Sequence, residues 1–296
     1  MNLKRFKQNP LIYPELHPSI GTNINGPSLI RVPDWLPNPL GRYYLYFGHH
    51  HGPLIRLAYA DQLEGPWQIY APGTLRVNET RCSDHIASPD VHIDPETRRL
   101  RMYFHGPVRQ APENATPNPE AAGQYSFVAH STDGIHFTAG TEILGAPYFR
   151  VFRWQEATYA LGMPGIFYRS ADGTTGFERG PVLFSRSMRH TAVQVKGSTL
   201  LVYYSSAGDC PERILRSTVD LRPDWRLWQA SLPVEVLAPE LPSEGVDLAL
   251  AASERGWAPE RVRQLRDPGI YEEDGRTFLL YSIAGEAGIA AAEIME

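Results

Sequence analysis

The sequence contains only 2 cysteines among 296 residues, Cys82 and Cys210, which is too few for a disulfide framework. No basic run is longer than two residues, as at Arg98-Arg99, and the formal net charge is -5, so we expect no nucleic-acid partner. No stretch approaches 18 consecutive apolar residues, so we expect no membrane-spanning helix. The charged N-terminal residues lack a following apolar run, unlike a secretory signal. We therefore expect a soluble, cytoplasmic protein.

Helical periodicity is also scarce. The 25 glycines and 26 prolines interrupt the chain too often for long helices. What the sequence has instead is a series of short runs rich in aromatic and β-branched residues, each bounded by turn residues, as at 43–47, 100–104 and 278–281. With 42% hydrophobic residues the chain can bury a sizeable core. The pattern predicts an all-β protein.

The runs follow a repeated order. An apolar strand opens at a polar or Asx-Pro corner, an aromatic strand follows a tight turn, and a third strand ends with Ser or Ala, Asp and an aromatic residue. Five such units open near Asn25, Asp90, Arg150, His190 and Asp267. Repeats of roughly 40–60 residues built from short strands predict radially arranged or stacked units. Segments 108–123 and 238–260 are predicted to be long loops, and 9–15 is predicted to supply the strand that closes a ring.

Two corners and two strand ends carry a family resemblance. The corners are Ser88-Pro89-Asp90 and Arg266-Asp267-Pro268, and the strand ends are 57–67 and 128–137. Together they resemble the five-bladed β-propeller glycosidases of the group around glycoside hydrolase families 43 and 117, over nearly the whole chain. The resemblance implies one five-bladed β-propeller domain over residues 1–296. It also implies a substrate pocket on the propeller axis, lined by the starts of the innermost strands.

The same resemblance implies catalysis by three acids from three blades: a base, a pKa-tuning aspartate and a proton donor. We expect Asp90 and Asp267 to point into the axial funnel, with Asp90 as the base. Arg266 beside Asp267 would keep that carboxylate ionised, which suits a stabilising role. The proton donor is expected to be either Glu244, on the long loop, or His190, because a histidine is proposed as the donor in family 117. Glycoside hydrolysis needs one group to protonate the leaving oxygen and another to activate water or attack the sugar.

The sequence departs from the family 43 pattern at two blades. Asn25 stands where a family 43 member usually has an aspartate, and the third unit has no acid at its start. Arginines in a funnel bind carboxylates or pairs of sugar hydroxyls, so an acidic sugar also fits the pattern. The residues expected to contact the substrate are Asn25, His50, His85, Arg150, Arg189 and Arg266.

Three consecutive histidines, His49 to His51, raise the question of a metal. Side chains alternate along a strand, so at most His49 and His51 share a face, and the ligand spacings of structural zinc sites are absent. The family resemblance leaves room for a single divalent ion, calcium or zinc, on the propeller axis.

The leading hypothesis is a glycoside hydrolase-like enzyme that acts on a short oligosaccharide or glycoside through carboxylates, with or without a histidine. Two alternatives stay open: a carbohydrate-binding propeller without catalysis, and a histidine- or metal-dependent propeller lyase or isomerase. The expected partner is a carbohydrate, with no nucleic acid and no membrane, and a homo-oligomer is compatible with the sequence.

Overall fold

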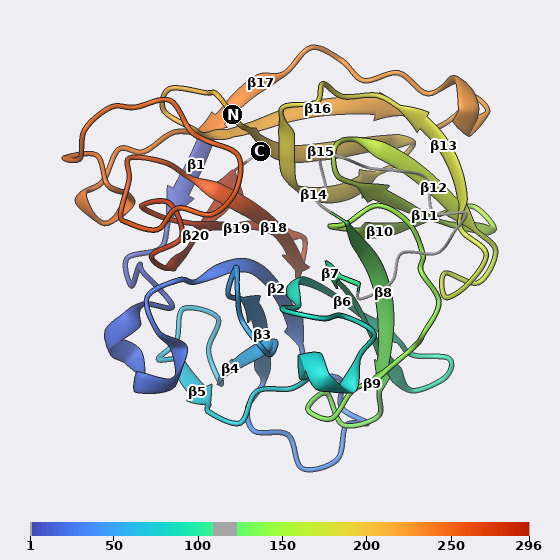
Figure 1. The fold of residues 1–296 in the computed structure, drawn as a ribbon, viewed down its shortest axis with the longest axis horizontal. Helices are drawn as coiled ribbons and strands as arrows, with labels where there is room; N and C mark the ends of the chain where they lie inside the picture. The colour runs from blue at the N-terminus through green and yellow to red at the C-terminus, as the bar shows by residue number, and fades with distance from the viewer. Residues whose placement is uncertain (1, 109–122, 296) are drawn as a thin grey trace.

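The computed structural model describes residues 2–108 and 123–295. They form five four-stranded antiparallel sheets arranged in a ring as the blades of a propeller (Figure 1). The predicted all-β class and the five blades are therefore confirmed. The described helices are short 3₁₀ turns, and none of them is long and apolar enough to span a membrane.

Each blade is a meander whose first strand lies innermost, and the last blade takes its fourth strand from the N-terminus. Blades one and two comprise β2 (Asn25–Arg31), β3 (Tyr43–Gly48), β4 (Arg56–Ala60), β5 (Gln68–Tyr70), β6 (Ala87–Asp94), β7 (Arg99–Pro107), β8 (Gln124–Ser131) and β9 (Thr138–Ala139). Blades three and four comprise β10 (Arg150–Trp154), β11 (Ala157–Gly162), β12 (Ile166–Ser170), β13 (Glu178–Val182), β14 (Met188–Lys196), β15 (Thr199–Ser206), β16 (Ile214–Asp220) and β17 (Val234–Leu237). Blade five comprises β18 (Arg266–Glu273), β19 (Arg276–Ser282), β20 (Ile289–Met295) and β1 (Asn2–Arg5).

The ring is closed by β1, which pairs antiparallel with β20 and places Leu3 opposite Ile294. Both termini therefore belong to one blade, as Figure 1 shows. The prediction that residues 9–15 would supply this strand is wrong. Pro10 and Pro14 lack the N–H groups that a paired strand needs, and this stretch contributes only an isolated bridge between Ile12 and Ile289.

The hydrophobic core lies between neighbouring blades, because each sheet is covered on both faces. In β3 the alternating side chains divide between two clusters: Tyr44 and Tyr46 pack toward the second blade, while Leu45 and Phe47 pack toward the fifth. This two-sided burial explains why the strands appear in the sequence as continuous apolar and aromatic runs. It also leaves polar side chains at the inner strand ends available for a site.

Candidate active site

One backbone position recurs at the inner start of every blade. Gly26, Ser88, Tyr148, His190 and Asp267 have φ values of 61°, 51°, 67°, 51° and 47°, a left-handed conformation that side chains other than glycine rarely adopt. In four blades a β-bulge sits at this point, where the inner strand has one residue more than its neighbour. Bulges re-aim side chains and often lie beside active sites. The structure thus aims one side chain per blade at the propeller axis, except at Gly26.

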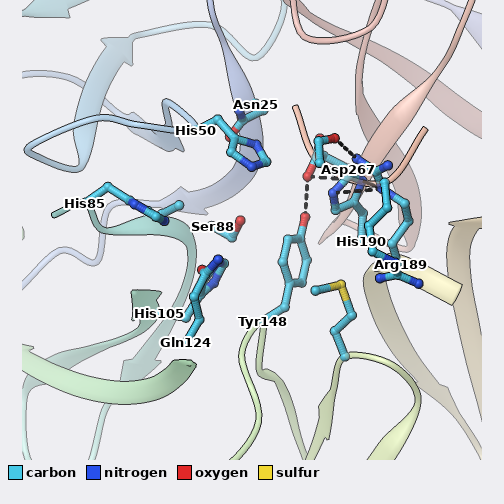
Figure 2. Close-up of a pocket in the computed structure, with 14 residues that line it drawn as sticks. Asn25, His50, His85, Ser88, His105, Gln124, Tyr148, Arg189, His190 and Asp267 are labelled. Atoms are coloured by element: carbon cyan, nitrogen blue, oxygen red, sulfur yellow. Dashed lines mark hydrogen bonds and ion pairs between the residues drawn. The ribbon is translucent and has the colours of Figure 1, made fainter. Parts of the chain in front are cut away.

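These side chains meet in an axial pocket of about 230 Å³. Figure 2 shows the hydroxyl of Tyr148 directed at Asp267, with His85 and His105 across the opening. Loops that follow the second strand of a blade contribute as well, including His50 after β3 and Met163 after β11. The lining residues are Asn25, His50, His85, Ala87, Ser88, His105, Gln124, Tyr148, Met163, Arg189, His190, Arg255, Gly256 and Asp267.

Asp267 is the carboxylate of this pocket. Its Oδ1 accepts a hydrogen bond of 2.5 Å from the Tyr148 hydroxyl and lies 3.7 Å from His190 Nδ1, while its buried Oδ2 has no hydrogen-bond partner among the described residues. Burial and the negative charge of Glu286 raise the pKa of Asp267 to about 6, against the opposing effects of Tyr148, Arg189 and Arg266. Arg266 lowers the pKa of Asp267, which is the expected direction, but burial and Glu286 outweigh it.

Arg266 instead holds two other carboxylates. Its Nη1 lies 3.0 Å from Glu286 Oε1, and its Nε lies 3.0 Å from Glu212 Oε2. Glu212 also accepts a hydrogen bond of 2.6 Å from the Ser205 hydroxyl and lies 3.6 Å from Arg189 Nε. Arg189 and Arg266 thus form ion pairs with buried glutamates behind the pocket. Their positive charges therefore stabilise the ionised form of Asp267 less than they would without these glutamates.

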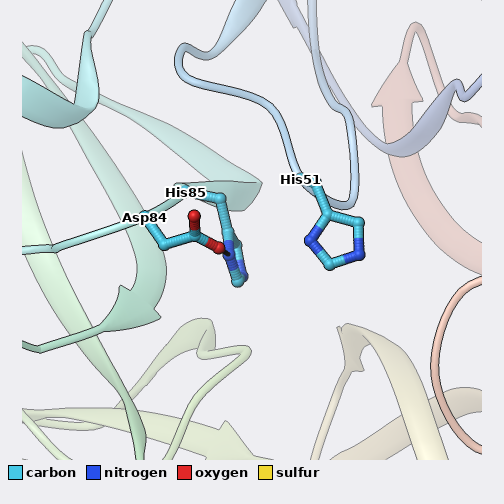
Figure 3. A group of neighbouring side chains, drawn as sticks. All are labelled: His51, Asp84 and His85. Atoms are coloured by element: carbon cyan, nitrogen blue, oxygen red, sulfur yellow. Dashed lines mark hydrogen bonds and ion pairs between the residues drawn. The ribbon is translucent and has the colours of Figure 1, made fainter.

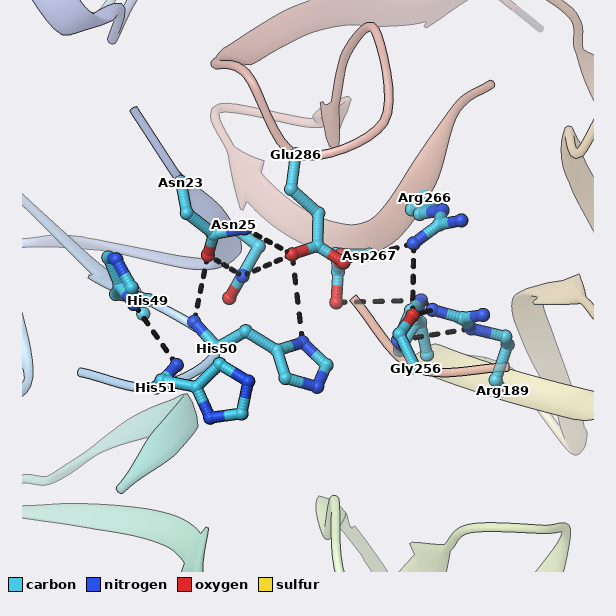
Figure 4. Close-up of polar contacts among 12 residues, drawn as sticks. Asn23, Asn25, His49, His50, His51, Arg189, Gly256, Arg266, Asp267 and Glu286 are labelled. Atoms are coloured by element: carbon cyan, nitrogen blue, oxygen red, sulfur yellow. Dashed lines mark hydrogen bonds and ion pairs between the residues drawn. The ribbon is translucent and has the colours of Figure 1, made fainter. Parts of the chain in front are cut away.

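Glu286 lies in the loop between β19 and β20 and faces His50 (Figure 4). Its Oε2 accepts hydrogen bonds from Asn23 at 2.6 Å and Asn25 at 3.2 Å, and lies 3.6 Å from His50 Nδ1. Burial acts to raise the pKa of Glu286, but His50, Arg266 and Asn23 outweigh it and hold the pKa at about 2. Glu286 and Asp267 are thus a pair of carboxylates whose pKa values the surroundings push in opposite directions, a pattern typical of acid–base sites.

Four histidines line the pocket, and they fall into two kinds. His105 and His190 are buried, and their pKa values are lowered well below the usual range, by burial first and then by His85 and Arg189 respectively. Both are therefore neutral at physiological pH. His50 and His85 each have a carboxylate partner instead, and His85 Nδ1 lies 3.0 Å from Asp84 Oδ2.

Asp90 does not point into the funnel. It lies two residues beyond the left-handed position of its blade, and its Oδ2 accepts hydrogen bonds of 2.8 Å from the Val151 N–H and from His92 Nε2. Burial alone would raise its pKa, but His92, Arg150 and the Val151 N–H lower it. Asp90 thus joins the second blade to the third, and Ser88 takes the pocket position of that blade.

Glu244 is also remote from the pocket. It is buried in the 3₁₀ turn η6 (Pro242–Glu244), where it forms an ion pair of 2.7 Å with Arg5 Nε and accepts a hydrogen bond of 2.9 Å from the Tyr281 hydroxyl. These contacts fasten the closing strand β1.

Among the predicted substrate contacts, Asn25, His50, His85 and Arg189 line the pocket, whereas Arg150 and Arg266 do not. Arg150 donates to the Ser88 and Thr191 carbonyl oxygens at 3.0 Å and 2.9 Å and stacks on the Tyr148 ring, so it ties three blades together. Sequence reasoning missed Glu286 and Glu212, which lie in turns outside the repeated strand pattern.

No protein-family model matches the sequence. An uncharacterised protein, R118, of Acanthamoeba polyphaga mimivirus is 36% identical over 308 residues, which cover 92% of this chain and 83% of the viral protein. The chain belongs to the same family as R118. That family assignment carries no activity with it, because R118 is itself uncharacterised.

Several solved structures share the fold of this chain. A family 43 β-xylosidase/α-arabinofuranosidase from a compost microbial metagenome, solved with xylotriose, matches with a TM-score of 0.63 and 13% identity over 100% of this chain and 96% of its own. A glycosyl hydrolase from Bacteroides ovatus matches with a TM-score of 0.66 and 10% identity over 99% and 93%. A family 43 enzyme from Xanthomonas citri matches with a TM-score of 0.61 and 12% identity over 93% and 89%. The five-bladed glycosidase propeller predicted from the sequence is confirmed as the fold.

Proposed function

We propose that this protein is a glycoside hydrolase-like enzyme that acts on a short oligosaccharide or glycoside in the axial pocket. The observation that carries the proposal is Asp267: a buried pocket carboxyl whose Oδ2 has no hydrogen-bond partner in the described part of the chain, and whose pKa is raised to about 6. A carboxyl tuned to that range can accept a proton near neutral pH, as a general base does. The structural similarity to family 43 glycosidases supports the same site on the same axis.

In this proposal Asp267 is the base and His50 is the proton donor. Glu286 lies 3.6 Å from His50 Nδ1 and stays ionised, so it orients the imidazole of His50. His105 and His190 are neutral and suit hydrogen bonds to sugar hydroxyls better than proton donation. The Tyr148 hydroxyl, 2.5 Å from Asp267, holds the base in place.

The pocket fits a small neutral sugar. Its volume of about 230 Å³ lies just below the ~300–1,000 Å³ typical of ligand pockets, which suits a small ligand. Arg189, which lines it, already donates to the carbonyl oxygens of Glu254 and Gly256 at 2.7 Å each, so it is a poor ligand for an acidic sugar. Similar structures were solved with xylotriose, xylose and galactose, which supports a carbohydrate ligand.

One observation favours the alternatives. Asp267 is the one carboxylate among the described residues that line the pocket, against four histidines. A propeller that binds a sugar without cleaving it needs no acid pair, and a lyase or isomerase needs only a base and hydrogen-bond donors.

The deciding experiment is a screen of aryl-glycosides and short oligosaccharides with the wild-type protein and Asp267→Asn, read as turnover and as a sugar-induced shift in Tm. Turnover that disappears in Asp267→Asn while the Tm shift persists supports the proposal. A Tm shift without any turnover in the wild type supports the binding propeller. A substrate that is isomerised or eliminated without hydrolysis supports the third function.

A further inference from the structure

We propose that His51, Asp84 and His85 form a binding site for a divalent transition-metal ion of the zinc class at the rim of the axial pocket. His85 lines the axial pocket, whereas His51 lines a neighbouring cavity of about 330 Å³, so the three residues lie at the border between the two. Of the three residues only His85 lines the axial pocket, and the proposal does not depend on the proposed glycosidase function.

The donor atoms already lie close together. One ligand atom from each residue lies within 4.8 Å of the other two, and Asp84 Oδ2 is 3.0 Å from His85 Nδ1. Figure 3 shows the His51 ring facing the Asp84–His85 pair from a different loop. Zinc bonds of about 2.0–2.2 Å place tetrahedral ligand atoms roughly 3.4 Å apart. His51 and Asp84 are exposed, so their side chains can turn through the remaining distance, which is at most about 1.4 Å.

The backbone fixes the two loops against each other at these residues. The Ile86 N–H, next to His85, donates to the Gly52 carbonyl oxygen, next to His51, at 3.2 Å. Gly106 lies directly under His85, where a Cβ atom would come within 2.3 Å of the His85 carbonyl oxygen. The His51 ring also packs edge-on against Trp257, with ring centroids 5.3 Å apart. Support of this kind is what a metal site needs around its ligands.

The donor set favours zinc or a similar ion over calcium. Two imidazoles and one carboxylate suit zinc, iron, copper or nickel, whereas calcium takes 6–8 oxygen ligands. Three protein ligands leave at least one coordination position for water or for a hydroxyl of a bound molecule. Because His85 lines the axial pocket, that position lies at the pocket rim.

The test is metal binding by the full-length protein without substrate. Chelator-treated protein is titrated with Zn²⁺ by calorimetry and with Co²⁺ by visible absorption. We expect one equivalent of metal, and an affinity reduced by more than about tenfold in His51→Ala and in Asp84→Asn. Both substitutions change exposed side chains, and circular dichroism and Tm check that each variant folds.

The matched control is His136→Ala. His136 also pairs with an aspartate, Asp133, at 2.7 Å, but the His136–Asp133 pair is not part of a three-ligand cluster among the described residues. We expect this variant to bind metal as the wild type does. The proposal is overturned if the wild type binds no stoichiometric metal, or if His51→Ala and Asp84→Asn bind it unchanged. Neither outcome affects the glycoside screen, because no substrate is present.

Discussion

Asp90 and Asp267 begin from similar corners and end in different environments. Both lie beside a proline at the inner start of a blade, and both blades carry a bulge there. Asp267 occupies the left-handed position itself, and its carboxyl lines the axial pocket with one oxygen that has no partner within residues 2–108 and 123–295. Asp90 lies two residues further along, and its carboxyl is held by His92 and the Val151 N–H of the next blade.

In these two blades, the position of an aspartate relative to the bulge decides whether its carboxyl lines the axial pocket or joins two blades. At the left-handed position burial and the charge of Glu286 outweigh the hydrogen bond from Tyr148, so the pKa of Asp267 rises. Two residues later it receives hydrogen bonds and its pKa falls. The first arrangement costs stability and leaves a reactive group, whereas the second joins two blades.

The largest expected effect separates the two acids by activity. Asp267→Asn should lower turnover of a glycoside by about 10³-fold, because it removes the proposed base. Asp90→Asn keeps an acceptor for the Val151 N–H and should lower turnover by less than about tenfold. Steady-state kinetics on the best substrate of the screen measures both. A loss in Asp90→Asn as large as that in Asp267→Asn would return the catalytic role to Asp90.

A second effect separates them by stability. The folded-state pKa of Asp267, about 6, lies above its usual value of 3.8, so its contribution to stability is complete below pH 3.8 and is lost as the pH rises through 6. The free energy of unfolding of the wild type, measured relative to Asp267→Asn, should fall by about 2 kcal/mol between ~pH 4 and ~pH 7. The pKa of Asp90 is lowered, so its contribution is present at neutral pH and lost in acid. Urea unfolding at several pH values tests both signs, and parallel slopes for the two variants would contradict the comparison.

Much of the fold could be predicted from the sequence, because blades buried on both faces leave continuous aromatic runs such as β3. The ring-closing strand could not, since β1 is only four residues long and Leu3, which packs against a core cluster, is its one apolar residue. The pocket role of Asp267 was predictable from its corner. The placement of Asp90 was missed, although the sequence holds a signal for it. When the corners are aligned on Pro27, Pro89 and Pro268, the residue that corresponds to Asp267 is Ser88 and not Asp90. Glu286 has no such signal, because a turn brings it to the site.

A third effect concerns the pH dependence that Tyr148 controls. If Asp267 acts as the base, kcat/KM should rise with pH through about 6, where its carboxyl ionises. The Tyr148 hydroxyl donates to Asp267 and favours the ionised form, so Tyr148→Phe should move this limb to higher pH. Tyr168→Phe, which removes a buried hydroxyl that accepts from the Ala146 N–H elsewhere in blade three, is the matched control and should leave the limb in place. If the rise of kcat/KM stays at the same pH in Tyr148→Phe, the ionisation of a group other than Asp267 causes it.

The smallest effect tests the backbone position that the comparison rests on. Ser88 adopts a φ of 51°, so Ser88→Gly should relieve strain of about 1–2 kcal/mol, largely offset by about 0.4–1 kcal/mol of added freedom in the unfolded chain. The net gain in the free energy of unfolding should stay below about 1.6 kcal/mol. Gly26→Ala makes the opposite change at the same position of blade one, where a Cβ atom would lie 3.0 Å from Ser88 Cα, and should cost about 1–2 kcal/mol. Urea unfolding measures both variants. Ser88→Gly could instead destabilise the protein by more than Gly26→Ala does. In that case the Ser88 hydroxyl stabilises the bulge by more than the backbone strain costs, and the side chain rather than the left-handed backbone sets the register.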